Sequence, residues 1–151
     1  MAVARDSLLT NDYVNHFAEL VMLLELVIES PHLIEDIRNW TPRSYCEHIG
    51  RIGFEPADSL RQAYERLEPA RRAMLDAVSG DANRLGAALR STIADANVAP
   101  ARLPGIVRIG CEGLHDHIRR LAAILANKPL AQIERNELIS QSDIDALLAA
   151  A

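Results

Sequence analysis

DYVNHFAELVMLLELVIE (residues 12–29) carries the strongest periodic pattern in this chain of 151 residues. Its apolar residues recur at intervals of three and four, which places them along one face of a helix: Phe17, Leu20, Val21, Leu24, Val27 and Ile28. Met22, Leu23 and Leu26 widen that face until the helix is apolar on nearly every side. Such a helix lies either at the centre of a bundle or at an interface between subunits.

Further helical patterns follow this segment along the chain. Two short and three long helices are expected, at residues 31–40, 41–53, 56–79, 81–97 and 105–127. Gly80-Asp81 is the expected turn between two of the long helices, and residues 98–104 read as a loop. Since no segment alternates apolar and polar residues as a strand does, we predict an all-α fold, a bundle of four main helices plus short ones.

The composition agrees with a helical class and argues against several others. Aromatic residues make up only 4% of the chain while 49% is hydrophobic, and a core built from aliphatic residues and Ala favours helices over strands. A net charge of −5 argues against binding nucleic acid or an anionic membrane surface. The most apolar run, residues 20–28, is far shorter than the roughly 20 residues of a membrane span. With no signal-peptide pattern at the N-terminus, we expect a cytoplasmic protein.

Two sets of residues are expected to serve packing. The first is a set of glycines at which helices would cross closely: Gly105, Gly110 and Gly113. The second is an aromatic group that would form a small satellite core beneath the short helices: Trp40, Tyr45 and Phe54.

The character of the sequence changes after Lys128-Pro129. Residues 129–138 read as a linker with some helical tendency, and residues 139–151 (ISQSDIDALLAAA) read as a short amphipathic helix. Residues 129–151 hold one Arg and four acidic residues, so they carry more than half of the net charge of −5. We therefore divide the chain into a helical bundle (1–128), a linker (129–138) and a C-terminal recognition helix (139–151).

The last segment has the residues of a helix start and one apolar face. Ser140 or Ser142 can accept a backbone N–H, while Asp143 and Asp145 favour the positive end of the helix dipole. The apolar residues lie at i, i+3 and i+4: Ile144, Leu147 and Leu148. A helix of about two turns is marginal alone in water, so it would pack on its own bundle or enter the groove of a partner.

The string ISQSDIDALLA (139–149) resembles the short N-terminal segment of the flagellar motor-switch proteins FliM and FliN, which typically reads L-S-Q-x-E-I-D-A-L-L. Seven positions match directly: Ser140, Gln141, Ile144, Asp145, Ala146, Leu147 and Leu148. Asp143 replaces the usual Glu, and Ile139 replaces the usual Leu. In those families this segment captures the phosphorylated chemotaxis response regulator CheY. Similar segments end the chemotaxis phosphatase CheZ, a helical bundle followed by a linker and a binding helix.

The resemblance implies a partner-binding site for a CheY-like receiver domain. The apolar residues Ile144, Leu147 and Leu148 would fill a groove on the receiver. The acidic Asp143 and Asp145 would meet basic residues at the rim of that groove. The polar Ser140 and Gln141 would fix the start of the helix. The implied role is an adaptor, sink or modulator in chemotaxis or flagellar signalling. The body of the chain does not resemble the α/β domain of the motor-switch proteins.

The comparison with CheZ suggests an enzymatic alternative. Phosphatases of that type use an acidic residue, which pairs with a Lys at the metal-bound site, and a Gln four positions later that orients the attacking water. Asp58 and Gln62 have this spacing, but their surroundings, PADSLRQAYE, differ from the Q-D-x-T-G-Q context of the family. The alternatives are a receiver phosphatase using Asp58 and Gln62, or an acid near a helix start beside a solvated Gln. We favour a binding protein over an enzyme.

A metal site or a cofactor is not expected. His115 and His117 lie two apart, so on a helix they face different ways. Glu112 and His115 form a single Glu-x-x-His set, which leaves a di-metal site incomplete. His16 and Glu19 lie three residues apart and could share one metal ion.

Cys46 and Cys111 are too few for a disulfide framework and are expected to act as small buried hydrophobic residues. A nucleophilic pair of Cys46 and His48 is not expected, because residues two apart on a helix diverge.

A third alternative is a structural protein that self-associates through its first helix. In that homo-oligomer the wide apolar face of residues 12–29 would form the contact. A Leu23→Glu or Leu26→Glu change would then lower the molecular mass in solution.

Overall fold

The computed structural model describes residues 12–52, 56–95 and 98–134. Within these ranges every regular element is helical and no strand occurs, so the predicted all-α class is confirmed. None of the helices in the described ranges has the length and apolar character needed to cross a membrane.

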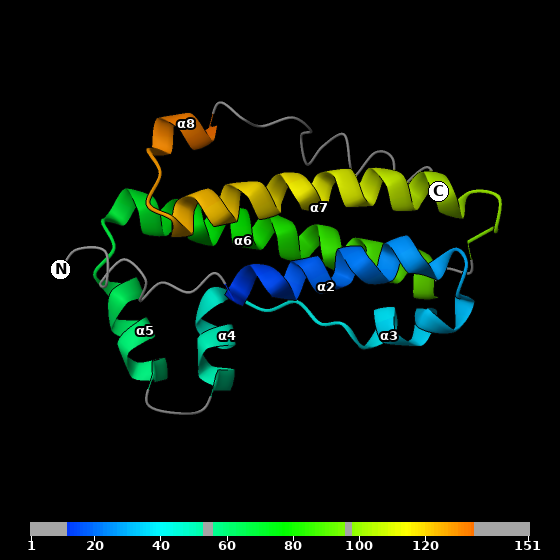
Figure 1. Ribbon diagram of the computed structural model, residues 1–151, viewed down its shortest axis with the longest axis horizontal. Coiled ribbons are helices and arrows are strands. Elements are labelled where there is room, and N and C mark those ends of the chain that lie inside the picture. Colours follow the sequence, from blue (N-terminus) through cyan, green and yellow to red (C-terminus); the bar gives the residue numbers. More distant parts are fainter. Residues whose placement is uncertain (1–11, 53–55, 96–97, 135–151) are drawn as a thin grey trace.

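Three long helices form the body of the molecule: α2 (Asp12–Val27), α6 (Pro69–Arg90) and α7 (Leu103–Leu125). Figure 1 shows them lying side by side, with α2 and α7 running in opposite directions. Six shorter elements are described as well: η1 (Pro31–Leu33), α3 (Ile34–Asn39), α4 (Tyr45–Ile52), α5 (Pro56–Glu65), the π-helical η2 (Ser91–Asp95) and α8 (Leu130–Glu134). α4 and α5 form a hairpin at one end of the long helices, whereas α3 and η1 lie along α2 (Figure 1).

Aliphatic side chains from all three long helices fill the core. The fully buried leucines include Leu20, Leu24, Leu75, Leu85, Leu89, Leu114 and Leu121. The helix stripe predicted for residues 12–29 is confirmed for its first five members, which are all buried. Its sixth member, Ile28, is 42% exposed because α2 has already ended at Val27.

The boundaries predicted around residues 56–97 are wrong. The expected helix 56–79 is divided at Pro69, and α6 then runs through the expected turn at Gly80-Asp81. Glu68 is extended at φ −59° and ψ 145°, since a residue before proline is pushed out of the α region. A Gly in the middle of a helix costs only about 1 kcal/mol, whereas a Pro costs about 3 kcal/mol. Contact with α7 along most of α6 outweighs the smaller cost.

The start of α4 also differs from the expected start at Thr41. Ser44 and Glu47 form a reciprocal capping box: the Glu47 N–H donates to Ser44 Oγ at 3.1 Å, and the Ser44 N–H donates to Glu47 Oε1 at 3.0 Å. These bonds satisfy two N–H groups at the helix start and lower the pKa of the Glu47 carboxyl. The helix therefore begins at Tyr45, and residues 41–44 are not helical.

Two glycines mark close contacts between elements. A Cβ on Gly86 would lie 2.5 Å from Trp40, and a Cβ on Gly110 would lie 2.5 Å from Leu89. The expectation for Gly110 is therefore confirmed. The expectation for Gly105 is wrong, because a Cβ there meets nothing within 4 Å.

The aromatic group predicted as a satellite core belongs to the main core instead. Trp40 and Tyr45 are buried beside α2, where Tyr13 contacts Tyr45 edge-on at 5.4 Å between ring centroids. Phe54, the third member of the predicted group, lies outside the described residues.

Packing continues beyond residue 128 into the segment predicted as a linker. The first part of that segment forms α8, whose Ile133 is 2% exposed and belongs to the core. The predicted recognition helix, 139–151, lies outside the described residues.

Candidate functional site

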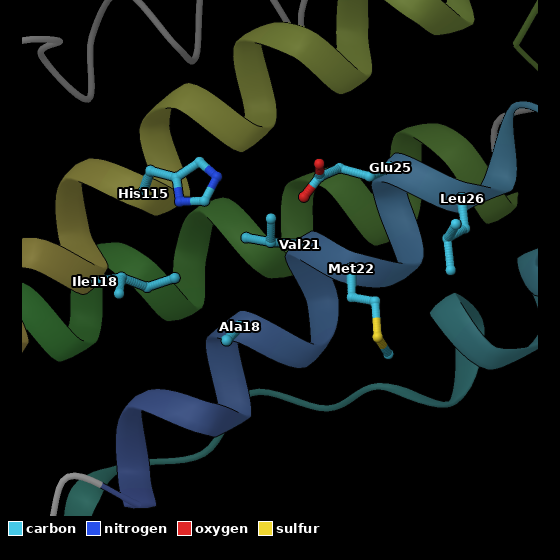
Figure 2. A pocket seen from close by; sticks show the side chains of 7 residues that line it. All are labelled: Ala18, Val21, Met22, Glu25, Leu26, His115 and Ile118. Carbon is cyan, nitrogen blue, oxygen red and sulfur yellow. The ribbon is translucent and has the colours of Figure 1, made fainter.

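A mostly apolar groove lies between α2 and α7, with a volume of about 420 Å³. α2 contributes Ala18, Val21, Met22, Glu25 and Leu26, and α7 contributes His115 and Ile118. Figure 2 shows the Glu25 carboxylate and the His115 imidazole facing each other between the two helices. A groove of this size, walled by two helices, can accept apolar side chains from another helix.

Two apolar side chains of the groove are unusually exposed for their type. Met22 is 52% exposed and Leu26 is 48% exposed. The expectation that α2 carries apolar residues beyond its core stripe is confirmed at these two positions. Leu23, by contrast, is only 8% exposed, so Leu23→Glu would disturb the core and cannot test a surface contact. Leu26 is the position at which such a test is valid.

The groove contains no activated thiol. Cys111 lies in the adjoining turn of α7 and is buried, and this burial, together with the charge of Glu25, raises its pKa to about 11. The Cys46 thiol also has a raised pKa because it is partly buried near Asp76. Both cysteines are therefore protonated at neutral pH, as the small hydrophobic role predicted for them requires.

A polar network joins the start of α2 to the segment before α4. His48 Nδ1 lies 3.2 Å from an Arg43 guanidinium nitrogen, and His48 Nε2 lies 2.9 Å from Asp12 Oδ2. Arginine can only donate, so Nδ1 accepts and Nε2 carries the ring proton toward Asp12.

The backbone of Arg43 is held by three further bonds. Its N–H donates to Asn83 Oδ1 at 2.9 Å, and its carbonyl accepts from Asn83 Nδ2 at 2.9 Å and from the Tyr13 hydroxyl at 2.6 Å. The network therefore fixes the segment between α3 and α4 against α2 and α6.

His16 lies beside this network and is buried. Its ring stacks on Trp40 with centroids 4.6 Å apart, and Trp40 Nε1 donates to the His16 carbonyl at 2.9 Å. Burial, followed by the positive charge of Arg43 and the neighbouring His48, lowers the pKa of His16 to about 4. The imidazole is therefore neutral at pH 7 and acts as a packing residue of the aromatic cluster.

Asp58 and Gln62 both lie on α5 and are both exposed. Their spacing of four residues places them one turn apart on one face of the helix, as expected. Neither the α2–α7 groove nor the polar network around Arg43 and His48 includes Asp58 or Gln62.

The candidate metal ligands do not come together. Among residues 12–52, 56–95 and 98–134, no group of three or more His, Cys, Asp or Glu side chains is arranged to hold a metal ion. His115 is exposed and His117 is buried, which confirms that these two residues face different ways.

Sequence reasoning identified only one wall of the α2–α7 groove. Met22 and Leu26 stood out as extra apolar residues, whereas His115 and Ile118 belong to a helix distant in sequence. The helix expected at residues 105–127 contains both of these residues. No family model, no curated protein and no solved structure matches the chain.

Proposed function

We propose that the protein is a helical adaptor that binds a phosphorylated CheY-like receiver domain through residues 139–148. The observation that carries the proposal is the string ISQSDIDALLA at 139–149, with its resemblance to the receiver-binding segment of the motor-switch proteins. The role belongs to chemotaxis or flagellar signalling, in the cytoplasm.

The packing of α8 supports this role. Ile133 is buried, and α8 contacts α7, so the chain is held on the bundle up to residue 134. Only a few residues then separate the bundle from Ser140. The receiver would therefore be held beside the bundle, where a second contact can add to its affinity.

Two other functions keep an observation in their favour. The exposed pair Asp58 and Gln62 on α5 favours a receiver phosphatase in which the C-terminal segment is a tether. The exposed Met22 and Leu26 favour a self-associating structural protein. A dephosphorylation assay distinguishes the phosphatase from the adaptor, and sedimentation distinguishes the self-associating protein.

The test is a titration against a CheY-type receiver, with and without a phosphoryl mimic. The proteins are the full chain, the chain ending at Leu138 and the full chain carrying Leu147→Ala. Of these three proteins, we expect only the unchanged full chain to bind, and its affinity should be higher for the activated receiver. Leu138→Ala is the matched control, since it makes the same change outside the segment, and it should bind as the full chain does.

Three outcomes separate the candidates. Binding that survives the removal of residues 139–151, or that is absent in every protein, contradicts the adaptor. Accelerated dephosphorylation of the receiver that is lost in Asp58→Ala and Gln62→Ala, with binding unchanged, establishes the phosphatase. A larger mass in sedimentation that falls with Leu26→Glu establishes self-association.

A further inference from the structure

We propose that the α2–α7 groove is the docking site for residues 144–148 of the same chain. The occupant is thus a named segment of this protein, and its apolar residues would cover Val21, Met22 and Leu26. The consequence for regulation, which rests on the proposed function, is that the bundle and a receiver compete for one face of this segment.

The groove has the shape and the chemistry of a helix-binding surface. Two helices wall it over about two turns of α2, from Ala18 to Leu26, and exposed apolar side chains stand at its edge. An amphipathic helix binds such a surface through residues at i, i+3 and i+4. Ile144, Leu147 and Leu148 have this spacing.

The length of chain beyond α8 is sufficient to reach the groove. From residue 135 to 143 an extended chain spans up to roughly 30 Å. The path back along α7 from Leu125 to Ile118 is only about 10 Å, at 1.5 Å per helical residue. The tether is therefore longer than the distance along the helix, and the short connection gives the segment a high effective concentration at the groove.

Position along the bundle favours this groove over a second apolar cavity that lies among the described residues. A cavity of about 520 Å³ lies among Ile28, Ile34, Ile93 and Leu103. Leu103 is the first residue of α7, so that cavity lies at the end of α7 opposite α8 (Figure 1). The α2–α7 groove is the nearer of the two to the point where the described chain ends.

The charges agree with one direction of docking. Because α2 and α7 run in opposite directions, Ala18 and Ile118 mark the end of the groove that is nearer α8 (Figure 1). A segment that enters from that side would place its acidic start, Asp143 and Asp145, toward Arg119, which follows the groove residue Ile118 on α7. Arg119 already pairs with Asp116 at 3.0 Å and keeps a half-exposed guanidinium for further acidic groups.

The test is hydrogen exchange of the amides of residues 144–148 in the full chain, without receiver. We expect protection in the natural sequence and, in Leu26→Glu, exchange about tenfold faster. Ile28→Glu is the matched control, because Ile28 is 42% exposed and lies outside this groove; its exchange should not change. Met22→Gln provides a second groove variant should Leu26→Glu fail to fold.

Three results would overturn the docking. They are unprotected amides at 144–148 in the natural sequence, equal effects of Leu26→Glu and Ile28→Glu, and protection that disappears on dilution. The last result would assign the groove to a second copy of the chain.

Receiver affinity tests the competition separately. If the segment is docked for about nine tenths of the time, Leu26→Glu should tighten receiver binding about tenfold, since the docked fraction is unavailable to the receiver. Unchanged affinity overturns the competition. A receiver that binds neither protein overturns the proposed function, while the exchange data still decide the docking.

Discussion

Gly86 and Trp40 show how tightly single residues are fitted where α6 meets α2. Two carbons of the indole ring would lie 2.5 Å and 2.7 Å from a Cβ on Gly86. The ring cannot move away easily, because its Nε1 is bonded to the His16 carbonyl and its face stacks on His16. We expect Gly86→Ala to lower the free energy of unfolding by about 1–3 kcal/mol, as overpacking does, in urea denaturation.

Gly105→Ala is the control for this prediction. It is also a helical Gly-to-Ala change, but the new methyl meets nothing within 4 Å. The higher helix propensity of Ala should therefore stabilise the protein by about 0.5 kcal/mol. Destabilisation of both variants by the same amount would show that the contact with Trp40 is not the cause.

The buried His16 predicts a dependence of stability on pH. Its pKa is about 4 in the folded protein and 6.5 in the unfolded chain, so the unfolded state binds more protons between these values. The contribution to the free energy of unfolding is thus complete above pH 6.5 and decreases as the pH falls toward 4. We expect His16 to account for a loss of about 2 kcal/mol at pH 4.5.

Chemical denaturation of the natural sequence and of His16→Gln at pH 4.5 and pH 7 measures this loss. All other ionisable groups are common to the two proteins, so the difference between the two pH profiles reports on His16. Parallel profiles would contradict the prediction.

The C-terminus of α7 is closed by backbone bonds and by one side chain from α6. The Lys128 N–H donates to the Ala123 carbonyl at 3.0 Å, the Asn127 N–H donates to Ile124 at 3.1 Å, and Asn127 has φ 61°. This is a Schellman motif with Asn in the left-handed position. The buried Arg71 adds bonds to the Ile124 and Lys128 carbonyls at 3.0 Å and 2.7 Å.

We expect Arg71→Ala to cost about 2 kcal/mol of unfolding free energy or more, because it leaves two carbonyls at the helix end without their charged donor. Arg71→Lys should recover little, since an ammonium lacks the planar fork that reaches both carbonyls. Arg72→Ala is the matched control: Arg72 bonds to the Glu65 carbonyl at 3.0 Å at an exposed site, so its loss should be small. Thermal and urea unfolding measure all three, and equal losses for Arg71→Ala and Arg72→Ala would refute this role.

Two helix starts were predicted wrongly although their local signals are present in the sequence. Pro69 starts α6 inside the helix expected at 56–79, and the Ser44–Glu47 capping box starts α4 three residues after the expected Thr41. Gly80-Asp81 resembles a turn but lies inside α6, because packing on α7 favours a continuous helix. Local propensities of about 1 kcal/mol are weaker than such contacts.

The exposed apolar surface of α2 governs the behaviour of the whole molecule. If residues 139–151 cover Met22 and Leu26, their removal uncovers an apolar patch, and patches of this kind promote association. We expect the chain ending at Leu138 to self-associate in sedimentation velocity as its concentration rises, while the full chain sediments as a monomer.

Adding Leu26→Glu to the shortened chain should restore the monomer, whereas Ile28→Glu should not. A shortened chain that stays monomeric at all concentrations would show that removing residues 139–151 exposes no surface that promotes association. A full chain that already associates would favour the homo-oligomer instead.

The all-α class and the apolar stripe of α2 are properties that the sequence alone determined. They depend on periodicity and capping, which act over a few neighbouring residues. The α2–α7 groove, the contact of Gly86 with Trp40 and the neutral His16 were decided only in the tertiary structure. Each of these brings together residues more than 20 positions apart, and which of them meet depends on how whole helices pack.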